Sequence, residues 1–155
     1  MTIHLRAHHL LCTLTFKGEG YSPAFVANYI SIVNRLNQGE DVLIVEGPDD
    51  ICAPLLQSSQ PHCLASSVLA RDATAARVLS SSLGRPIEVG SRIDMSATHT
   101  ALSRQAFHTP DVRQACNGCE WSALCTGIAA ADYANVLLHP AAPMSGKEST
   151  SSNAL

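Results

Sequence analysis

Three cysteines within ten residues near the end of the chain constrain the fold more than any other feature. They stand in the run Cys116-Asn117-Gly118-Cys119-Glu120-Trp121-Ser122-Ala123-Leu124-Cys125. A C-x2-C pair places two sulfurs on one tight turn, and a third cysteine about a turn and a half of helix later can face the same point. This spacing predicts a site for a soft metal ion or an iron-sulfur cluster, completed by a fourth ligand from elsewhere in the chain.

The chain has 155 residues, which is enough to bury one hydrophobic core. We expect a single Cys-rich domain over residues 1–139 and a disordered tail over 140–155, which is rich in Pro, Ser, Ala and Gly. The net charge is −3, so the surface offers no basic footprint for nucleic acid. No segment is apolar over the length of a membrane span. Nucleic acid and membrane are therefore not expected partners.

The six cysteines are expected to be thiols rather than disulfides. The apolar residues of the first sixteen positions are interrupted by charged and ionisable side chains, namely His4, Arg6, His8 and His9. This segment lacks the continuous apolar core and the cleavage site of a secretion signal. We therefore expect a cytoplasmic protein, and in a reducing compartment clustered cysteines more often serve metal binding or catalysis than cross-linking.

The first half of the chain predicts a small βαβ-like unit. Residues 2–6 alternate polar and apolar side chains as a short strand does, and 8–16 have helical spacing. Ser22 and Pro23 are typical of a helix start, because the hydroxyl caps free N–H groups and proline costs nothing at the first position. The apolar run 42–45 predicts a strand buried on both faces.

The second half predicts more helices and a weak strand. Apolar spacing indicates helices over residues 64–83, 96–107 and 121–138. Residues 86–89 begin with proline and suggest an edge strand. Asp111 and Gln114 resemble a capping box on the turn before Cys116. The expected fold class is α+β, with several helices packed around a small sheet and a Cys-rich C-terminal helical segment.

Two further cysteines, Cys52 and Cys63, are candidates for the fourth ligand because both fall in expected loops. The predicted cofactor-binding and metal-binding set is therefore Cys52, Cys63, Cys116, Cys119 and Cys125. A zinc site usually supplies a second C-x2-C or a histidine pair, which is missing here. Scattered ligands suit a cluster, whose irons are spread apart. We therefore favour an iron-sulfur cluster of the 4Fe-4S type, with zinc as the alternative.

Cys12 has apolar neighbours and allows two interpretations. It is a core residue, since free cysteine behaves as a small hydrophobe. Alternatively it is the nucleophile of a thiol enzyme, because His8 precedes it by four residues on the same predicted helix and could share its proton. His9 points to a different face of that helix, so at most one of the two histidines shares the face of Cys12.

Two pairs of charged residues have simpler interpretations. Asp49-Asp50 follows Gly47-Pro48, a pattern typical of a turn and helix cap, although two carboxylates could also bind a hard cation. Arg71-Asp72 lies within a predicted helix and is expected to form a solvated or locally paired surface.

Several short motifs share their order and spacing with a known family. They are Arg6-Ala7-His8-His9-Leu10-Leu11-Cys12, Phe16-Lys17-Gly18-Glu19-Gly20-Tyr21-Ser22, Asp49-Asp50-Ile51-Cys52, Cys63 and the C-terminal cysteines with Trp121. Over residues 3 to 138 the chain resembles the bacterial and archaeal family called domain of unknown function 1284. The resemblance implies an iron-sulfur binding protein and names no reaction.

The resulting functional hypothesis is a cluster-binding protein with an electron-transfer or redox-sensing role and an unidentified redox or protein partner. One alternative is an interaction module held together by structural zinc. The other is a thiol enzyme that uses Cys12 with His8.

Overall fold

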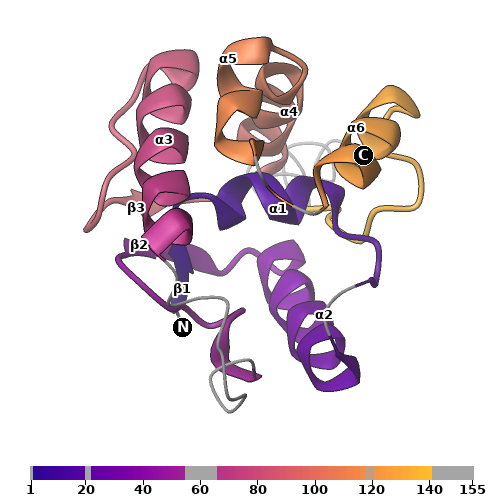
Figure 1. Ribbon diagram of the computed structural model, residues 1–155. Helices are drawn as coiled ribbons and strands as arrows, with labels where there is room; N and C mark the ends of the chain where they lie inside the picture. Colours follow the sequence, from indigo (N-terminus) through magenta and orange to yellow (C-terminus); the bar gives the residue numbers. More distant parts are fainter. Residues whose placement is uncertain (1, 20–21, 55–65, 118, 120, 141–155) are drawn as a thin grey trace, which may run out of the picture.

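The computed structural model describes residues 2–19, 22–54, 66–117, 119 and 121–140. In chain order the elements are β1 (Thr2–Arg6), α1 (His9–Thr15), α2 (Pro23–Asn37), β2 (Asp41–Val45), α3 (Ser66–Leu83), β3 (Arg92–Ile93), α4 (Ala97–Phe107), α5 (Pro110–Arg113), the 3-10 helix η3 (Gln114–Cys116) and α6 (Ser122–Ala130). Helices pack against a small sheet at one side of the molecule, so the predicted α+β class is confirmed (Figure 1). Cys63 and the predicted tail, except for Pro140, lie outside the described residues.

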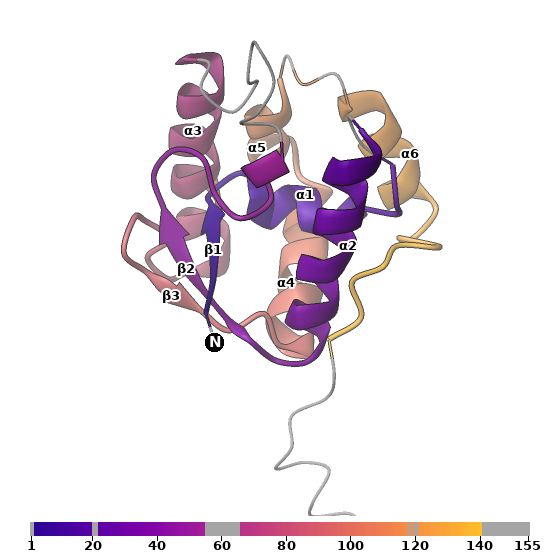
Figure 2. The same cartoon turned by 90° about the horizontal axis from the view of Figure 1, so that it is seen from below.

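The three strands form one mixed sheet in the order β1-β2-β3 (Figure 2). β1 and β2 are parallel, with Ile3 beside Val42 and Leu5 beside Ile44, and the helices between them complete the predicted βαβ-like unit. Along β2, Val42 and Ile44 are buried while the alternate residues are half-buried. The expectation of a strand buried on both faces is wrong, because one face of this three-stranded sheet remains partly open to solvent.

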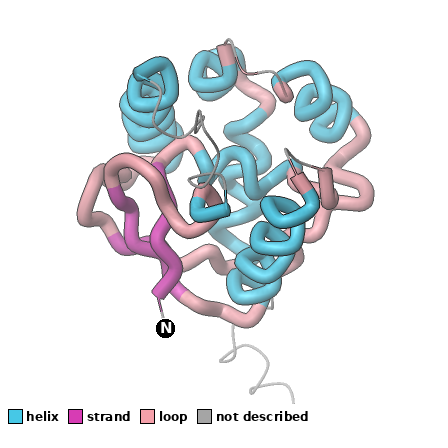
Figure 3. The backbone as a smooth tube through the Cα atoms, turned by 60° about the horizontal axis from the view of Figure 1, so that its bottom comes forward, coloured by secondary structure: helices cyan, strands magenta, loops and turns pink. Residues whose placement is uncertain are grey.

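Helix α1 lies in the middle of the fold. Figure 1 shows it crossing between α3 and α6, with α4 and α5 on one side and α2 on the other. The tube view in Figure 3 places the strands at one side of the molecule and helices around the rest. Leu10, Leu11 and Leu14 of α1 are buried in the core, together with the two histidines at its start. Side chains on α1 can therefore reach elements from both ends of the chain.

The predicted start of α2 is confirmed. Ser22 is the N-cap, and its hydroxyl accepts a hydrogen bond of 3.1 Å from the backbone N–H of Phe25. Pro23 occupies the first turn, and Gly39 has the positive φ of 95° that follows a helix end.

We expect Ser22→Ala to lower the free energy of unfolding by about 1 kcal/mol, because it removes the acceptor for one free N–H group of the helix. Urea unfolding at neutral pH measures the change. Ser31→Ala is the matched control, since Ser31 is exposed within the same helix. Equal stability of the Ser22→Ala variant and the wild type would contradict the capping role.

Three sequence predictions in the second half are wrong in detail. Residues 86–89 do not form a strand, because the N–H of Ile87 donates to the Ser80 hydroxyl at 2.8 Å and strand β3 follows the turn at Gly90. The cap of α5 is Thr109, whose hydroxyl accepts from the N–H of Val112 at 3.4 Å, and not Asp111. Helix α6 ends at Ala130 instead of residue 138.

The early end of α6 has a backbone cause. Asp132, Tyr133 and Asn135 have positive φ angles of 58°, 59° and 68°, which a right-handed helix does not allow. Tyr133, Val136 and Leu138 nevertheless pack into the core, which explains the apolar character of this stretch. Among the described residues, none of the helices combines the length and the apolar character needed to cross a membrane.

Candidate metal centre

One pocket of about 110 Å³ is lined by all five cysteines that the structure describes. They come from different elements and are Cys12, Cys52, Cys116, Cys119 and Cys125. The structure thus brings together four members of the predicted set, while Cys63 lies outside the described residues. Cys12, which the sequence left between core packing and catalysis, lies in the wall of the same pocket.

Local backbone bonds position the three C-terminal thiols. Cys116 ends η3, and its carbonyl accepts a bond of 3.0 Å from the N–H of Cys119. The N–H of Cys125 donates at 2.9 Å to the carbonyl of Trp121 in the first turn of α6. A tight turn followed by a helix start is the arrangement that the C-x2-C spacing predicts.

Helix α1 adds Cys12 to this group. Thr15 follows Cys12 by three residues, so both lie on the same side of α1. The Thr15 hydroxyl is 3.1 Å from the sulfur of Cys125, which fixes that side of α1 against α6. Burial raises the pKa of Cys12 well above its usual value, and the thiols of Cys125, Cys119 and Cys116 raise it further. The four thiols therefore share one electrostatic environment.

Two arginines offset the charge that these thiols would carry as thiolates. Burial raises the pKa of Cys125 as well, and the guanidinium of Arg113 opposes this shift. Arg113 is held at the start of α6 by bonds from Nη2 to the Ser122 carbonyl, 3.1 Å, and to the Thr126 hydroxyl, 2.9 Å. Arg71 lines the pocket and acts in the same direction on Cys12.

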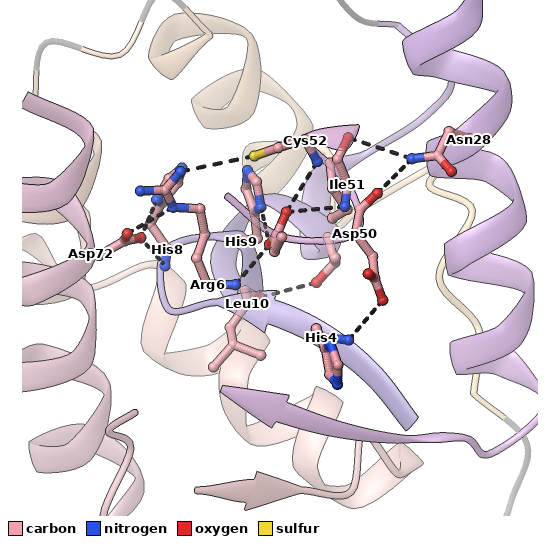
Figure 4. A network of polar contacts seen from close by, with 12 residues as sticks. His4, Arg6, His8, His9, Leu10, Asn28, Asp50, Ile51, Cys52 and Asp72 are labelled. Atoms are coloured by element: carbon pink, nitrogen blue, oxygen red, sulfur yellow. Dashed lines mark hydrogen bonds and ion pairs between the residues drawn. The ribbon is translucent and has the colours of Figure 1, made fainter. Parts of the chain in front are cut away.

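A second group of donor atoms borders the same pocket. One atom each of His9, Asp49 and Cys52 lies within 4.8 Å of the others, close enough for all three to reach one metal ion. His9 and Cys52 line the pocket, and Cys52 is only 1% exposed. Figure 4 shows the side chains of His9 and Cys52 directed toward one another.

Asp49 is the anchor of this second group. One carboxylate oxygen accepts from the N–H groups of Ile51 and Cys52 at 3.0 and 3.1 Å. The other accepts from the N–H of Arg6 and from Nδ1 of His9, both at 2.7 Å. Burial favours the neutral acid, but His9 and the backbone donors outweigh it and lower the pKa of Asp49 to about 2. The predicted turn at Asp49 is confirmed, and a buried histidine partner is added.

Arg6 and His8 share a second carboxylate, Asp72. The fully buried Arg6 donates from Nε to one oxygen of Asp72 at 2.7 Å, and Nδ1 of His8 lies 2.6 Å from the other (Figure 4). Burial, followed by the neighbouring charge of His9, lowers the pKa of His8 to about 4. The expectation that Arg71-Asp72 forms a solvated or locally paired surface is wrong for Asp72, because its partners come from the start of the chain.

The family assignment follows from residues 20–125, which match the family model described as "Protein of unknown function (DUF1284)". The chain belongs to the DUF1284 family. The match covers more than half of the chain and includes Cys52, Cys63 and the three C-terminal cysteines. The searches of curated proteins and of solved structures gave no match.

In this DUF1284 protein the sequence reasoning missed the two carboxylate–histidine pairs, His8 with Asp72 and His9 with Asp49. A signal for them was present. Arg6, His8 and His9 are polar residues that interrupt an apolar segment, and polar groups can be buried there only with partners. The sequence alone did not reveal which carboxylates those partners are.

Proposed function

We propose that this protein binds an iron-sulfur cluster through Cys12, Cys116, Cys119 and Cys125, and uses it in electron transfer or redox sensing. The observation that carries the proposal is the meeting of these four thiols from α1, η3, the following turn and α6 at one pocket. Thiolates are the usual ligands of such clusters, so the donor set fits the group. When bound, the cluster would supply one-electron exchange.

The spacing of the thiols supports a cluster over a single zinc ion. Zinc–sulfur bonds of about 2.3 Å in a tetrahedron require sulfurs about 3.8 Å apart. In the described part of the chain, one ligand atom each of His9, Asp49 and Cys52 lies within 4.8 Å of the others. The four proposed ligands do not form a group with sulfurs this close together. Ligands spread around a pocket suit a cofactor larger than one ion.

The charges around the pocket also support this proposal. Four thiolates give a cluster site a negative charge, which is costly where solvent is partly excluded. Arg71 and Arg113 each stabilise the charged form of a proposed ligand, Cys12 and Cys125 respectively. With a cluster bound, these two side chains would offset the negative charge of the site and tune the reduction potential of the cluster.

Cys12 is the fourth ligand that the geometry favours, where the sequence suggested Cys52 or Cys63. Thr15 holds the Cys12 side of α1 against Cys125 at 3.1 Å. Cys52 lies at the same pocket, but its sulfur is paired with Arg6 Nη1 at 3.9 Å and grouped with His9 and Asp49.

Protein purified without oxygen is expected to contain iron and sulfide and to absorb visible light, with an absorption change on reduction that reverses on reoxidation. Cys12→Ser should lose most of the iron and sulfide, because a hydroxyl replaces a thiolate ligand. Cys52→Ser is the matched control and should keep them. Metal analysis, sulfide assay and the visible spectrum measure the outcome.

Other results would favour a different metal, a different fourth ligand or a different role. One zinc per chain without iron or sulfide would support the structural zinc alternative. Loss of iron in Cys52→Ser but not in Cys12→Ser would make Cys52 the fourth ligand. A cluster that cannot be reduced and reoxidised would contradict the proposed redox role.

A further inference from the structure

We propose that Cys52 is a nucleophilic thiol that adds to small, mostly apolar carbonyl compounds carrying an activated carbon–carbon double bond. Cys52, His9 and Asp49 would form the reacting group, and Tyr29 would bind the carbonyl oxygen. These residues are separate from the four proposed cluster ligands but line or border the same pocket, so the proposed reaction belongs to the protein without its cluster.

The first support is the order of contacts from Asp49 to His9 to Cys52. Nδ1 of His9 lies 2.7 Å from a carboxylate oxygen of Asp49, which can only accept, so Nδ1 carries the hydrogen. In the neutral ring Nε2 is then the free base. Figure 4 shows the His9 ring directed toward the sulfur of Cys52, so this base faces the thiol. An oriented histidine beside a thiol is the arrangement that activates cysteine nucleophiles.

The hydrogen bonds of Asp49 favour this reading over a metal site. A carboxylate has about four lone-pair positions. Asp49 already accepts four bonds, from the N–H groups of Arg6, Ile51 and Cys52 and from the His9 ring. A metal ion could use Asp49 only by displacing a donor that is buried with it. Asp49 is thus better suited to position His9 than to bind a cation.

Arg6 provides a fixed positive charge for the thiolate. Its Nη1 is 3.9 Å from the sulfur of Cys52. The side chain is fully buried, and Asp72 holds Nε at 2.7 Å, so the guanidinium has a fixed position. A thiolate beside arginine and histidine is the reactive form of cysteine.

Tyr29 and the pocket walls define the class of compound. The Tyr29 side chain lines the pocket and is 5% exposed, and its hydroxyl has no hydrogen-bond partner among the described residues. A buried donor of this kind needs an acceptor, such as a carbonyl oxygen. Much of the remaining wall is apolar and comes from Leu11, Phe16, Phe25, Phe107 and Leu124. A small apolar compound with one carbonyl group matches this lining.

The addition is balanced without a further reactant. His9 takes the proton of the Cys52 thiol, and the sulfur forms a bond to the β-carbon of the substrate. The electron pair of the double bond moves toward the carbonyl oxygen, which the Tyr29 hydroxyl stabilises as an enolate. The proton on His9 is then transferred to the α-carbon. The product is a thioether, with no leaving group and no change in redox state.

The test uses N-ethylmaleimide, an activated alkene with carbonyl groups, on the full chain, and mass spectrometry follows the Cys52 peptide over time. An ordinary thiol would react roughly 80-fold faster at pH ~8 than at pH ~6, because its thiolate fraction follows a pKa near 8.5. The reaction rate of Cys52 in the folded protein should change less than about fivefold between these two pH values. The charged and titratable groups next to Cys52 are Arg6, His9 and Asp49. The others that line its pocket are His8, Cys12, Lys17, Glu19, Tyr29, Arg71, Cys116, Cys119 and Cys125.

Two comparisons make the result specific. His9→Gln should restore the steep pH dependence of the Cys52 labelling rate. If this variant does not fold, the urea-unfolded wild type shows how the rate depends on pH when Cys52 has none of its folded neighbours. Tyr29→Phe removes a hydroxyl that has no partner among the described residues, so this variant should fold. It should slow the reaction of Cys52 with N-ethylmaleimide about tenfold. It should leave the rate with allyl bromide, which has no carbonyl, unchanged.

Three outcomes would overturn the proposal: an unlabelled Cys52, a steep pH dependence in the folded wild type, or equal slowing of both reagents in Tyr29→Phe. The readout is specific to one peptide, and it is taken on protein freed of iron, because a cluster on the other thiols would fill the pocket that Cys52 lines. Loss of iron in Cys52→Ser would show instead that Cys52 is a cluster ligand, and would overturn its role as the nucleophile.

Discussion

Replacing Asp72 with alanine is expected to lower the free energy of unfolding by about 3–5 kcal/mol, because it breaks a buried ion pair. Arg6 is fully buried, and the change removes its carboxylate partner at 2.7 Å. The same carboxylate also accepts from the backbone N–H and from Nδ1 of His8, at 3.3 and 2.6 Å. Urea unfolding followed by circular dichroism measures the loss.

Arg92→Ala is the matched control for this prediction. It removes an ion pair with Asp41 of the same length, 2.7 Å, but the two side chains are 62% and 41% exposed. Exposed pairs contribute about 1 kcal/mol or less. If both variants lose the same small amount, the pairing of Arg6 with Asp72 does not stabilise the fold as proposed.

Asp49→Ala is expected to lower the free energy of unfolding by about 4 kcal/mol or more, which approaches the whole stability of a small domain. The buried carboxylate accepts four hydrogen bonds, and three backbone N–H groups would lose their acceptor at once. Asp50→Ala is the control. Asp50 is the next residue, and its side chain accepts one exposed bond, from the N–H of His4 at 2.9 Å. A loss of about 1 kcal/mol or less is expected there.

The stability due to Asp49 should also depend on pH. Its pKa is lowered from the usual 3.8 to about 2 in the folded state, so the folded state favours the carboxylate. This contribution, about 2 kcal/mol, is fully present above pH 3.8 and is lost as the pH falls through 2. Asp49→Asn cannot titrate and should show less acid destabilisation than the wild type by that amount. Parallel acid curves for the two proteins would contradict this result.

Local signals in the sequence were sufficient for much of the fold. The strand β1, the Ser22 cap of α2 and the parallel pairing of β1 with β2 were predicted, because alternation, capping and chain order carry that information within a few residues. The turn of Cys116 and Cys119 was predicted for the same reason. Element ends were less certain, as the positive φ angles at Asp132 and Tyr133 illustrate.

The partners of the buried polar groups could not be predicted in this way. Arg6 meets Asp72 across 66 positions of sequence, and His9 meets Asp49 across 40. No local pattern encodes such pairs, because they depend on how helices and strands pack. The same holds for Cys12. Its apolar neighbours suggested a core position, and only the packing of α1 against α6 places it beside the C-terminal thiols.

The position of Cys12 on α1 has a consequence for biosynthesis. Thr15, which fixes that side of the helix, meets Cys125 across 110 residues of sequence. At a synthesis rate of about 5–20 residues per second, the first thiol waits roughly 5–20 s for the other three to leave the ribosome. The four proposed ligands are therefore all present only after Cys125 has been synthesised. A cofactor held by all four proposed ligands would have to bind after Cys125 has been synthesised, and the Cys12 thiol would have to stay reduced until then.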